Sequence, residues 1–251
     1  MDLGLRGRTV IVTGASGGLG RHIAWGFAAE GADLVLAYHR SAADAQRVAK
    51  EIEGRTLLVE YDLGDAASAR ALADAAIEWT GRIDVLVNNA VHWGGTDGPE
   101  DRPFEVVPDA DWLRVLRANT EGALQLSRLV VPVMRQRRWG RLVHISSSLA
   151  TDGMAGAEYY AAAKAALHGF SRSAAFGLGA SGDILSNVVT PGLTRTDTNT
   201  AIVDAVGDHF SARAPLGRLL DAVEVAGPVV YLGSAANTGI TGQVIAVTGG
   251  A

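Results

Sequence analysis

The chain has 251 residues, of which 48% are apolar and 20% charged, and its formal net charge at pH 7 is −5. This composition suffices for one large hydrophobic core, so a single domain over residues 1–251 is predicted. The negative charge gives no electrostatic basis for binding nucleic acid, and the absence of cysteine excludes disulfides and thiolate metal sites. No run approaches the roughly 20 apolar residues of a membrane span, and no signal-peptide pattern is present, so we expect a cytoplasmic protein without membrane contact.

The first predicted unit is a strand, a glycine-rich turn and a helix. TVIVT (9–13) is apolar and branched, GASGGLG (14–20) follows at once, and an amphipathic helix then runs to about Gly31. Gly14, Gly18 and Gly20 would let the backbone approach a ligand, and the helix N-terminus offers N–H groups to a pyrophosphate. In a chain with 31 glycines the pattern could also form an ordinary turn, but its place after a strand favours a dinucleotide site.

The second unit indicates which dinucleotide is bound. DLVLAY (33–38) is a predicted strand, and a helix over 41–54 follows with Ser41 as its N-cap. An acid at the tip of such a strand would bind the ribose of NAD, whereas a base would pair with the 2′-phosphate of NADP. Arg40 and Ser41 stand there without an acid, which favours NADP over NAD. Arg40 as a solvated loop charge is the alternative.

Further strands and helices alternate along the chain. Strands are predicted over 56–62 and 82–90, with a helix over 67–81 between them. This alternation of apolar strands and helices predicts an α/β fold of Rossmann type, with a doubly wound parallel sheet of about seven strands covered by helices on both faces. Ligands bind beyond the carboxyl ends of such strands, where Asp62, Asn88 and Asn89 are expected.

The middle of the chain combines a loop with a long helix. Glycines and prolines predict a loop over 92–108, and a helix is predicted over 109–138 with Asp109 near its cap. Asn119, in the middle of this helix, is either exposed or turned inward to bond a buried group. Pro132 is expected to kink the helix or to end its regular part.

The next strand and helix carry the clearest chemical pattern. LVHIS (142–146) predicts a buried strand, and the alanine-rich segment 157–170 predicts a helix on which Tyr160 and Lys164 share one face. A tyrosine beside an ammonium is a candidate proton donor. Beyond it we expect a strand over 183–190, a loop over 191–200, a helix over 222–234 and a last strand over 242–250. Residues 201–220 are weakly patterned and predict short helices covering a site, or a disordered excursion.

These residues resemble the short-chain dehydrogenase/reductase family over nearly the whole chain. Five motifs occur in the family's order: Thr13 to Gly20 (TGASGGLG), Asp62-Leu63, Asn88-Asn89-Ala90, Ser147 followed by Tyr160 and Lys164, and Pro191-Gly192. The resemblance implies catalytic roles for Asn119, Ser147, Tyr160 and Lys164. Together with the loop after the second strand, it implies cofactor contacts at Gly14, Ser16, Gly18, Leu19, Gly20, Arg40, Ser41, Asp62, Leu63, Asn89, Ala90, Tyr160, Lys164, Pro191, Gly192, Leu193, Thr194 and Thr196.

The family's chemistry assigns a role to each catalytic side chain. Tyr160 would protonate a carbonyl oxygen that Ser147 also contacts, while a nicotinamide delivers hydride to the carbon. Lys164 would lower the pKa of the phenol toward neutrality and bind the nicotinamide ribose. Asn119 would hold a water for proton resupply. Ser146 and Ser148 are expected to be structural, and Tyr159 lacks a lysine four residues later.

Two positions depart from the family pattern. Val91 replaces the glycine of NNAG and adds bulk beside the cofactor, although we expect activity to survive. Gly17 stands where many NADP-preferring relatives carry a base, so Arg40 would provide most of the phosphate recognition.

Substrate contacts are expected from Trp93, Ser147, Met154, Tyr160 and Leu193, whose apolar members suit a bulky ketone. Within the family this resembles 3-oxoacyl thioester reductases and ketoreductases of aromatic polyketide pathways, because Trp93 could stack on a planar ring. Packing of Trp93 within its own loop is the alternative. A secondary-alcohol or sugar dehydrogenase using NAD, and a catalytically silent nucleotide sensor, are the rival functions. The family's habit suggests a homotetramer, and residues 193–220 are expected to form a substrate lid. No metal site is predicted.

Overall fold

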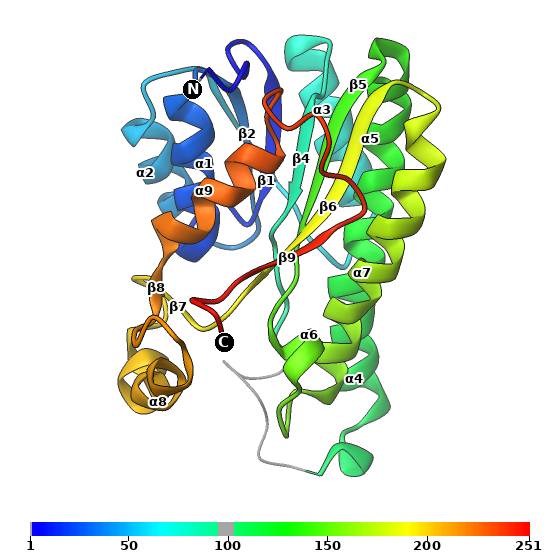
Figure 1. The fold of residues 1–251 in the computed structure, drawn as a ribbon. Coiled ribbons are helices and arrows are strands. Elements are labelled where there is room, and N and C mark those ends of the chain that lie inside the picture. The colour runs from blue at the N-terminus through cyan, green and yellow to red at the C-terminus, as the bar shows by residue number, and fades with distance from the viewer. Residues whose placement is uncertain (1, 95–102) are drawn as a thin grey trace.

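The computed structural model describes residues 2–94 and 103–251. Within this part of the chain seven parallel strands form one sheet in the order β3-β2-β1-β4-β5-β6-β9 (Figure 1). The predicted doubly wound α/β fold is therefore confirmed. The strands are β1 (Thr9–Thr13), β2 (Asp33–Tyr38), β3 (Thr56–Glu60), β4 (Val85–Asn88), β5 (Trp139–Ile145), β6 (Asp183–Pro191) and β9 (Val244–Val247).

The order of the strands places two turns side by side. The chain winds outward from β1 to β3 and then returns to the other side of β1 with β4, so Val12 lies opposite both Leu36 and Val87. The turns after β1 and β4 therefore meet at the carboxyl edge of the sheet. A parallel sheet has its natural ligand site at such a reversal of strand order.

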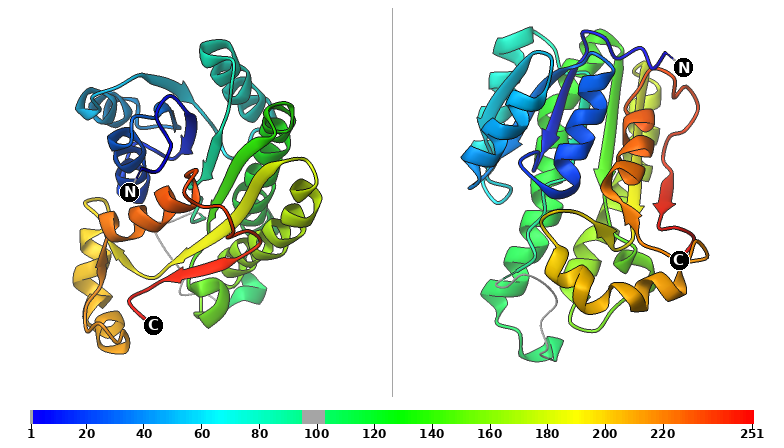
Figure 2. Two further views of the ribbon diagram at one scale, coloured as in Figure 1. Left: turned by 45° about the horizontal axis from the view of Figure 1, so that its top comes forward. Right: turned by 90° about the vertical axis from the view of Figure 1, so that its left-hand side faces the viewer.

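Helices cover both faces of the sheet because alternate strand residues point to opposite sides. Val10 and Val12 belong to one buried cluster, whereas Ile11 belongs to the other. Figure 2 shows the two helical layers with the sheet between them. One layer holds α1 (Gly18–Ala29), α2 (Ala42–Glu51) and α9 (Ala222–Leu232), and the other holds α3 (Ala66–Thr80), α5 (Ala123–Arg137) and α7 (Glu158–Gly179).

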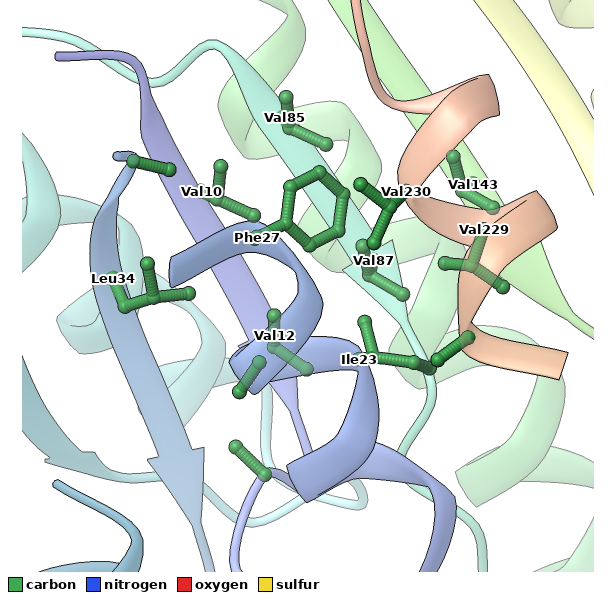
Figure 3. Packing of buried hydrophobic residues seen from close by; sticks show 14 of the residues in the cluster. Val10, Val12, Ile23, Phe27, Leu34, Val85, Val87, Val143, Val229 and Val230 are labelled. Carbon is green, nitrogen blue, oxygen red and sulfur yellow. The ribbon is translucent and has the colours of Figure 1, made fainter. Parts of the chain in front are cut away.

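Phe27 of α1 shows how the first layer is held. Its side chain is fully buried and lies among residues of β1, β4 and α9, including Val10, Val85 and Val230 (Figure 3). Burying a phenylalanine of this kind stabilises the fold by roughly 1.5–3 kcal/mol. This packing fixes α1, and with it the glycine turn that precedes the helix.

The long helix predicted over 109–138 contains a change of winding. It comprises α4 (Asp109–Leu116), a π-helical segment η2 (Arg117–Gly122) and α5. Asp109 is the first residue of α4, and Pro108 occupies the N-cap position. Pro132 lies inside α5, which continues to Arg137, so the alternative in which the helix ends at the proline is wrong.

The segment after β6 is more regular than predicted. One helix, α8 (Thr200–Arg213), replaces the expected short helices or disordered excursion. Two short strands, β7 (Thr194–Arg195) and β8 (Leu220–Asp221), pair in parallel at its base and were not predicted. Only Gly207 of α8 is buried, and this explains why its amphipathic pattern is weak.

Smaller elements complete the described chain. They are the 3₁₀ turn η1 (Phe104–Val106) and the short helix α6 (Leu149–Asp152). Residues 95–102 of the predicted loop 92–108 lie outside the described residues. Ser41 holds the N-cap position of α2 as predicted, but its side chain makes no capping hydrogen bond. Among the described helices, none combines the length and apolar character needed to cross a membrane.

Candidate active site

The turn after β1 depends on glycine at three positions. Gly14 and Gly18 adopt positive φ angles of 66° and 51°, which glycine tolerates best. Gly20 packs so closely on the carbonyl oxygen of Gly14 that a Cβ atom there would collide with it. The turn then opens directly into α1, whose first N–H groups are available to a phosphate. This arrangement fits the dinucleotide that the sequence predicts.

The end of β4 is bonded to the end of β1. The Asn89 amide nitrogen donates to the Thr13 carbonyl oxygen at 2.8 Å, and the backbone N–H groups of Asn89 and Ala90 both donate to the Thr13 hydroxyl at 2.9 Å. Asn89 and Ala90 were predicted to contact the cofactor, and the structure places them against the glycine turn. The part played by Thr13 was missed, because nothing in its local sequence indicates a partner 76 residues away.

The groups predicted to bind the adenosine half lie after β2 and β3. Arg40 and Ser41 are exposed beyond β2, where a 2′-phosphate could reach them. Asp62 follows β3; its carboxylate accepts the N–H of Gly64 at 2.8 Å and lies 3.7 Å from His39. Leu63 is half-buried against Gly122 of η2. The two loops therefore border the same edge of the sheet as the glycine turn.

Tyr160 and Lys164 lie on one face of α7, as predicted, and both are buried, with 7% and 2% of their surface exposed. The Lys164 Nζ atom lies 5.8 Å from the centre of the Tyr160 ring and donates to the Ile145 carbonyl oxygen at 2.9 Å. Ser147, two residues after β5, accepts the N–H of Leu149 at 3.2 Å, and its hydroxyl is near enough to the Tyr160 phenol to lower the pKa of that group. The structure thus brings the three predicted side chains together.

Burial governs the charges of this group. It raises the pKa of Tyr160, and the hydrogen bond with Ser147 opposes the rise. It lowers the pKa of Lys164 to about 8. The expected lowering of the phenol pKa toward neutrality is not found, because loss of solvation outweighs the attraction of an ammonium that is bonded to a backbone carbonyl.

Asn119 is turned inward. It is 2% exposed and lies in η2, where its Oδ1 atom accepts the N–H of His92 at 3.0 Å. Its amide nitrogen donates to the carbonyl oxygens of His92, at 2.6 Å, and Val115, at 2.9 Å. The alternative of an exposed Asn119 is therefore wrong. The side chain fixes the backbone after β4, and its role in holding a water stays a prediction.

Two tryptophans stack on the adjacent tyrosines of α7. The rings of Trp93 and Tyr160 have centroids 4.3 Å apart and an interplanar angle of 22°. The rings of Trp112 and Tyr159 have centroids 5.2 Å apart at 19°. The Tyr159 hydroxyl donates to the Phe104 carbonyl oxygen at 2.9 Å, away from Lys164. Trp93 therefore packs on Tyr160 rather than only within its own loop.

The loop after β6 folds back over the glycine turn. Pro191 is buried, Gly192 and Leu193 are half-buried, and the Thr194 hydroxyl donates to the Gly192 carbonyl oxygen at 3.0 Å. The Thr196 and Thr198 hydroxyls lie 3.1 Å apart, and Thr198 packs against Gly17 and Gly18.

An ion pair between Arg21 of α1 and Asp197 fastens this loop. The pair was not predicted, because its partners lie in segments far apart in sequence that no local spacing connects.

The remaining polar residues at this edge are structural in their contacts. Ser146 donates to the Lys164 carbonyl oxygen at 3.1 Å and lies 2.8 Å from the Nε2 atom of His168. Ser148 holds the N-cap position of α6.

Met154, predicted to contact substrate, is 36% exposed after α6, and Val91 is 42% exposed. Across the described residues, no group of three histidines or acids could hold a metal ion.

Comparison with known proteins agrees with this geometry. The profile of a family described as Enoyl-(Acyl carrier protein) reductase matches residues 14–251. The 3-oxoacyl-acyl-carrier-protein reductase of Escherichia coli (strain K12) is 35% identical, with the alignment covering 99% of this chain and 98% of that protein. An L-rhamnose 1-dehydrogenase (NAD(P)(+)) of Sphingomonas sp. (strain SKA58) is 36% identical over 98% of this chain and 96% of that protein.

A solved structure of a short chain dehydrogenase is similar to this chain in both fold and sequence. A short chain dehydrogenase from Burkholderia cenocepacia J2315, in complex with NADP, superposes with a TM-score of 0.88. It is 32% identical to this chain, and the match covers 98% of each. Together with the five motifs and the parallel sheet, these matches show that the chain belongs to the short-chain dehydrogenase/reductase family and is an NAD(P)-dependent oxidoreductase.

Proposed function

We propose that the protein is an NADPH-dependent ketoreductase acting on a bulky, hydrophobic ketone. The observation that carries this proposal is the grouping of Ser147, Tyr160 and Lys164 at the carboxyl edge of the sheet, beside the glycine turn. A nicotinamide bound there would supply hydride to the carbonyl carbon. The protein's own groups would supply the proton and stabilise the charge that develops on oxygen.

The three side chains have distinct roles in the proposed reaction. Tyr160 donates its phenolic proton to the carbonyl oxygen, because its raised pKa keeps the phenol protonated throughout the neutral range. Ser147 donates a hydrogen bond to the same oxygen as negative charge develops. Lys164, charged below about pH 8, stabilises the phenolate that remains after proton transfer and would bind the cofactor's ribose.

The choice of NADP over NAD rests on the loop after β2. Arg40 and Ser41 are exposed at the tip of this strand, and no acid stands between Tyr38 and Ser41 to repel a phosphate. The Burkholderia relative was solved with NADP. The contacts proposed for the rest of the cofactor are the glycine turn, Asp62-Leu63, Asn89-Ala90 and the loop from Pro191 to Thr196.

The substrate proposal rests on apolar side chains from the loops after β4, α6 and β6, of which Trp93 stacks on Tyr160. Trp93, Met154 and Leu193 offer an apolar wall that suits a 3-oxoacyl thioester or an aromatic polyketide intermediate. We further propose one domain, with residues 193–220 as a lid over the substrate, in a cytoplasmic homotetramer. The β7–β8 pair at the base of α8 supports the lid, because it closes this segment into a unit outside the main sheet.

The test combines nucleotide binding with turnover. Isothermal titration with NADPH and NADH should show tighter binding of NADPH, and Arg40→Ala should reduce this preference. Turnover is then measured as the loss of NADPH or NADH absorbance, with a 3-oxoacyl thioester and with fused-ring ketones as substrates. Tyr160→Phe should lower kcat by roughly 10²–10⁴-fold while nucleotide binding persists. Retained turnover in this variant would remove Tyr160 as the proton donor.

An NAD-dependent dehydrogenase of secondary alcohols or sugars is the second candidate. The observation that favours it is the 36% identity to the L-rhamnose dehydrogenase, which is as high as the identity to the 3-oxoacyl reductases. Turnover of rhamnose or related sugars with NAD, and none with ketones and NADPH, would establish it. A silent nucleotide sensor would bind nucleotide without any turnover.

A further inference from the structure

Trp93 occupies a place that the family motifs do not explain. Its indole lies 4.3 Å from the Tyr160 ring in a nearly parallel stack, although 43% of the Trp93 surface is exposed. The tyrosine, by contrast, is 7% exposed. The indole is therefore part of the cover that separates one face of the Tyr160 ring from solvent.

The backbone of His92, the residue before Trp93, is held in place by Asn119 of η2. Asn119 accepts the N–H of His92 and donates to its carbonyl oxygen, so one buried side chain grips both polar groups of the residue before Trp93. Asn119 is itself fixed by its bond to Val115 within the helix. The π-helical segment, the loop after β4 and the ring of Tyr160 are thus joined in a series of direct contacts.

We propose that Trp93 is a positioning residue, which holds the Tyr160 ring in its reactive orientation and shields it from water by stacking. This inference deepens the proposed function and rests on it, since it concerns the tyrosine that would donate the proton. Asn119 acts in the same series by fixing the loop that carries the indole. The amide of Asn119 thereby acquires a second task beside the one that the family resemblance implies.

The second tryptophan–tyrosine stack shows what Trp93 adds. Trp112 stacks on Tyr159 at nearly the same angle and also fixes α7, but Tyr159 bonds the Phe104 carbonyl and has no lysine beside it. Removing Trp112 would disturb the packing of α7 without uncovering the ring of Tyr160. Trp112→Ala is therefore the matched control for Trp93→Ala.

The groups that act on the Tyr160 hydroxyl are few. Ser147, just after β5, lowers the pKa of the phenol, and Lys164 lies one turn along α7. His92 stands beside the indole, and its own pKa is lowered by burial. Burial is what raises the pKa of Tyr160, and no charged side chain adds to the rise. The charged groups on the elements packed against this end of α7 are Asp109, Asp111, Arg114, Arg117, Glu121 and Asp152, and Glu158 lies on α7 itself. Solvation of the ring is therefore the property that Trp93 controls.

The first measurement does not involve catalysis. Tyrosinate absorbance is followed against pH in the full-length protein and in Trp93→Ala, and the matching Tyr160→Phe variants are subtracted to isolate Tyr160. Opening the ring to water favours the charged phenolate, so the pKa of Tyr160 should fall in Trp93→Ala. Trp93→Phe, which keeps an aromatic ring on Tyr160, and Trp112→Ala should leave it near its original value. An unchanged pKa in Trp93→Ala would overturn the proposal.

The second measurement is the kinetics of ketone reduction. Loss of positioning in Trp93→Ala should lower kcat by about 10–100-fold, with the affinity for NADPH unchanged, and Trp93→Phe should restore most of it. The rates are compared at pH 7, where Lys164 is charged and the phenol is protonated, so that a lower kcat reports positioning and not protonation. A higher kcat in Trp93→Ala would instead mean that the indole obstructs the site, and would also overturn the proposal.

The two measurements separate this inference from the proposed function. If Tyr160 is not the proton donor, Tyr160→Phe stays active, while the directly measured pKa of Tyr160 still falls in Trp93→Ala. If Tyr160 is the donor but Trp93 has no part in positioning it, Tyr160→Phe is inactive and both Trp93 variants behave as the unaltered protein.

Discussion

Lys164 is one of only two lysines in the chain and is buried to 2% exposure. Among residues 2–94 and 103–251, its ammonium has one hydrogen bond, to the Ile145 carbonyl oxygen. Holding a charge in such surroundings costs stability unless the charge is paired. The residue therefore has a function that is worth this cost, in agreement with its proposed role beside Tyr160.

The cost can be measured as a dependence of stability on pH. Burial lowers the pKa of Lys164 from 10.5 to about 8, so between these values the unfolded chain binds more protons than the folded protein. The free energy of unfolding should therefore rise with pH across this window, by about 3 kcal/mol from this group. Lys164→Met should abolish the rise, raise the stability at neutral pH and eliminate turnover. Urea denaturation between pH 7 and 10 measures the effect, and parallel curves for both proteins would contradict it.

Strand β5 carries a histidine that is wholly enclosed by the sheet and its helices. His144, opposite Asn88 of β4, is fully buried, and its Nδ1 atom lies 3.1 Å from the Asn88 amide nitrogen. Burial, and then the charge of Lys164, lower the pKa of His144 to about 4. The ring is neutral in the folded protein near pH 6, and charging it there would be costly.

This histidine should make the sheet sensitive to acid. Between about pH 6.5 and 4 the unfolded chain binds a proton that folded His144 does not, so the free energy of unfolding should fall by about 3 kcal/mol as the pH is lowered. His144→Leu should reduce this fall. The same change at His209, which is exposed on α8, serves as the control. An acid denaturation profile unaffected by His144→Leu would exclude His144 as the cause.

The strands and helices also show how much of the fold could be predicted from local sequence. Strands such as TVIVT and LVHIS were found because apolar, branched runs report burial directly. The π-helical turn at Asn119 was not predicted, and the bond from His92 to that side chain joins it to another segment of the chain. Trp93 on Tyr160, Thr13 on Asn89 and Arg21 on Asp197 were missed for the same reason. Each of these contacts joins residues far apart in sequence, which no spacing within one element reveals.

At the scale of the whole molecule, a buried carboxylate joins the first strand to the fourth at the amino edge of the sheet. Asp84 is fully buried; both its oxygens lie 2.6 Å from the guanidinium of Arg82, and one lies 3.0 Å from that of Arg8. Asp84 also accepts the backbone N–H of Thr9 at 2.8 Å. The site thus fastens the sheet at the edge opposite the proposed active site.

Removing this carboxylate should destabilise the protein without altering its chemistry. Asp84→Ala leaves Arg82 and Arg8 without their partner and is expected to cost about 3–5 kcal/mol in the free energy of unfolding. Asp33→Ala breaks a pair with Arg55, which is largely exposed, and should cost less than about 1 kcal/mol. Urea denaturation measures both. A similar loss of unfolding free energy in the two variants would show that Asp84 stabilises the sheet no more than a largely exposed ion pair does.

On the ribosome, β1 can pair with β2 soon after both emerge, because Val12 lies opposite Leu36. Its other neighbour, β4, follows only when Val87 has been synthesised, and at about 5–20 residues per second this takes a few seconds more. Until then one side of an apolar strand presents unpaired N–H and C=O groups to any passing chain. The reversal of strand order that creates the ligand site therefore also lengthens the interval in which a nascent chain can aggregate.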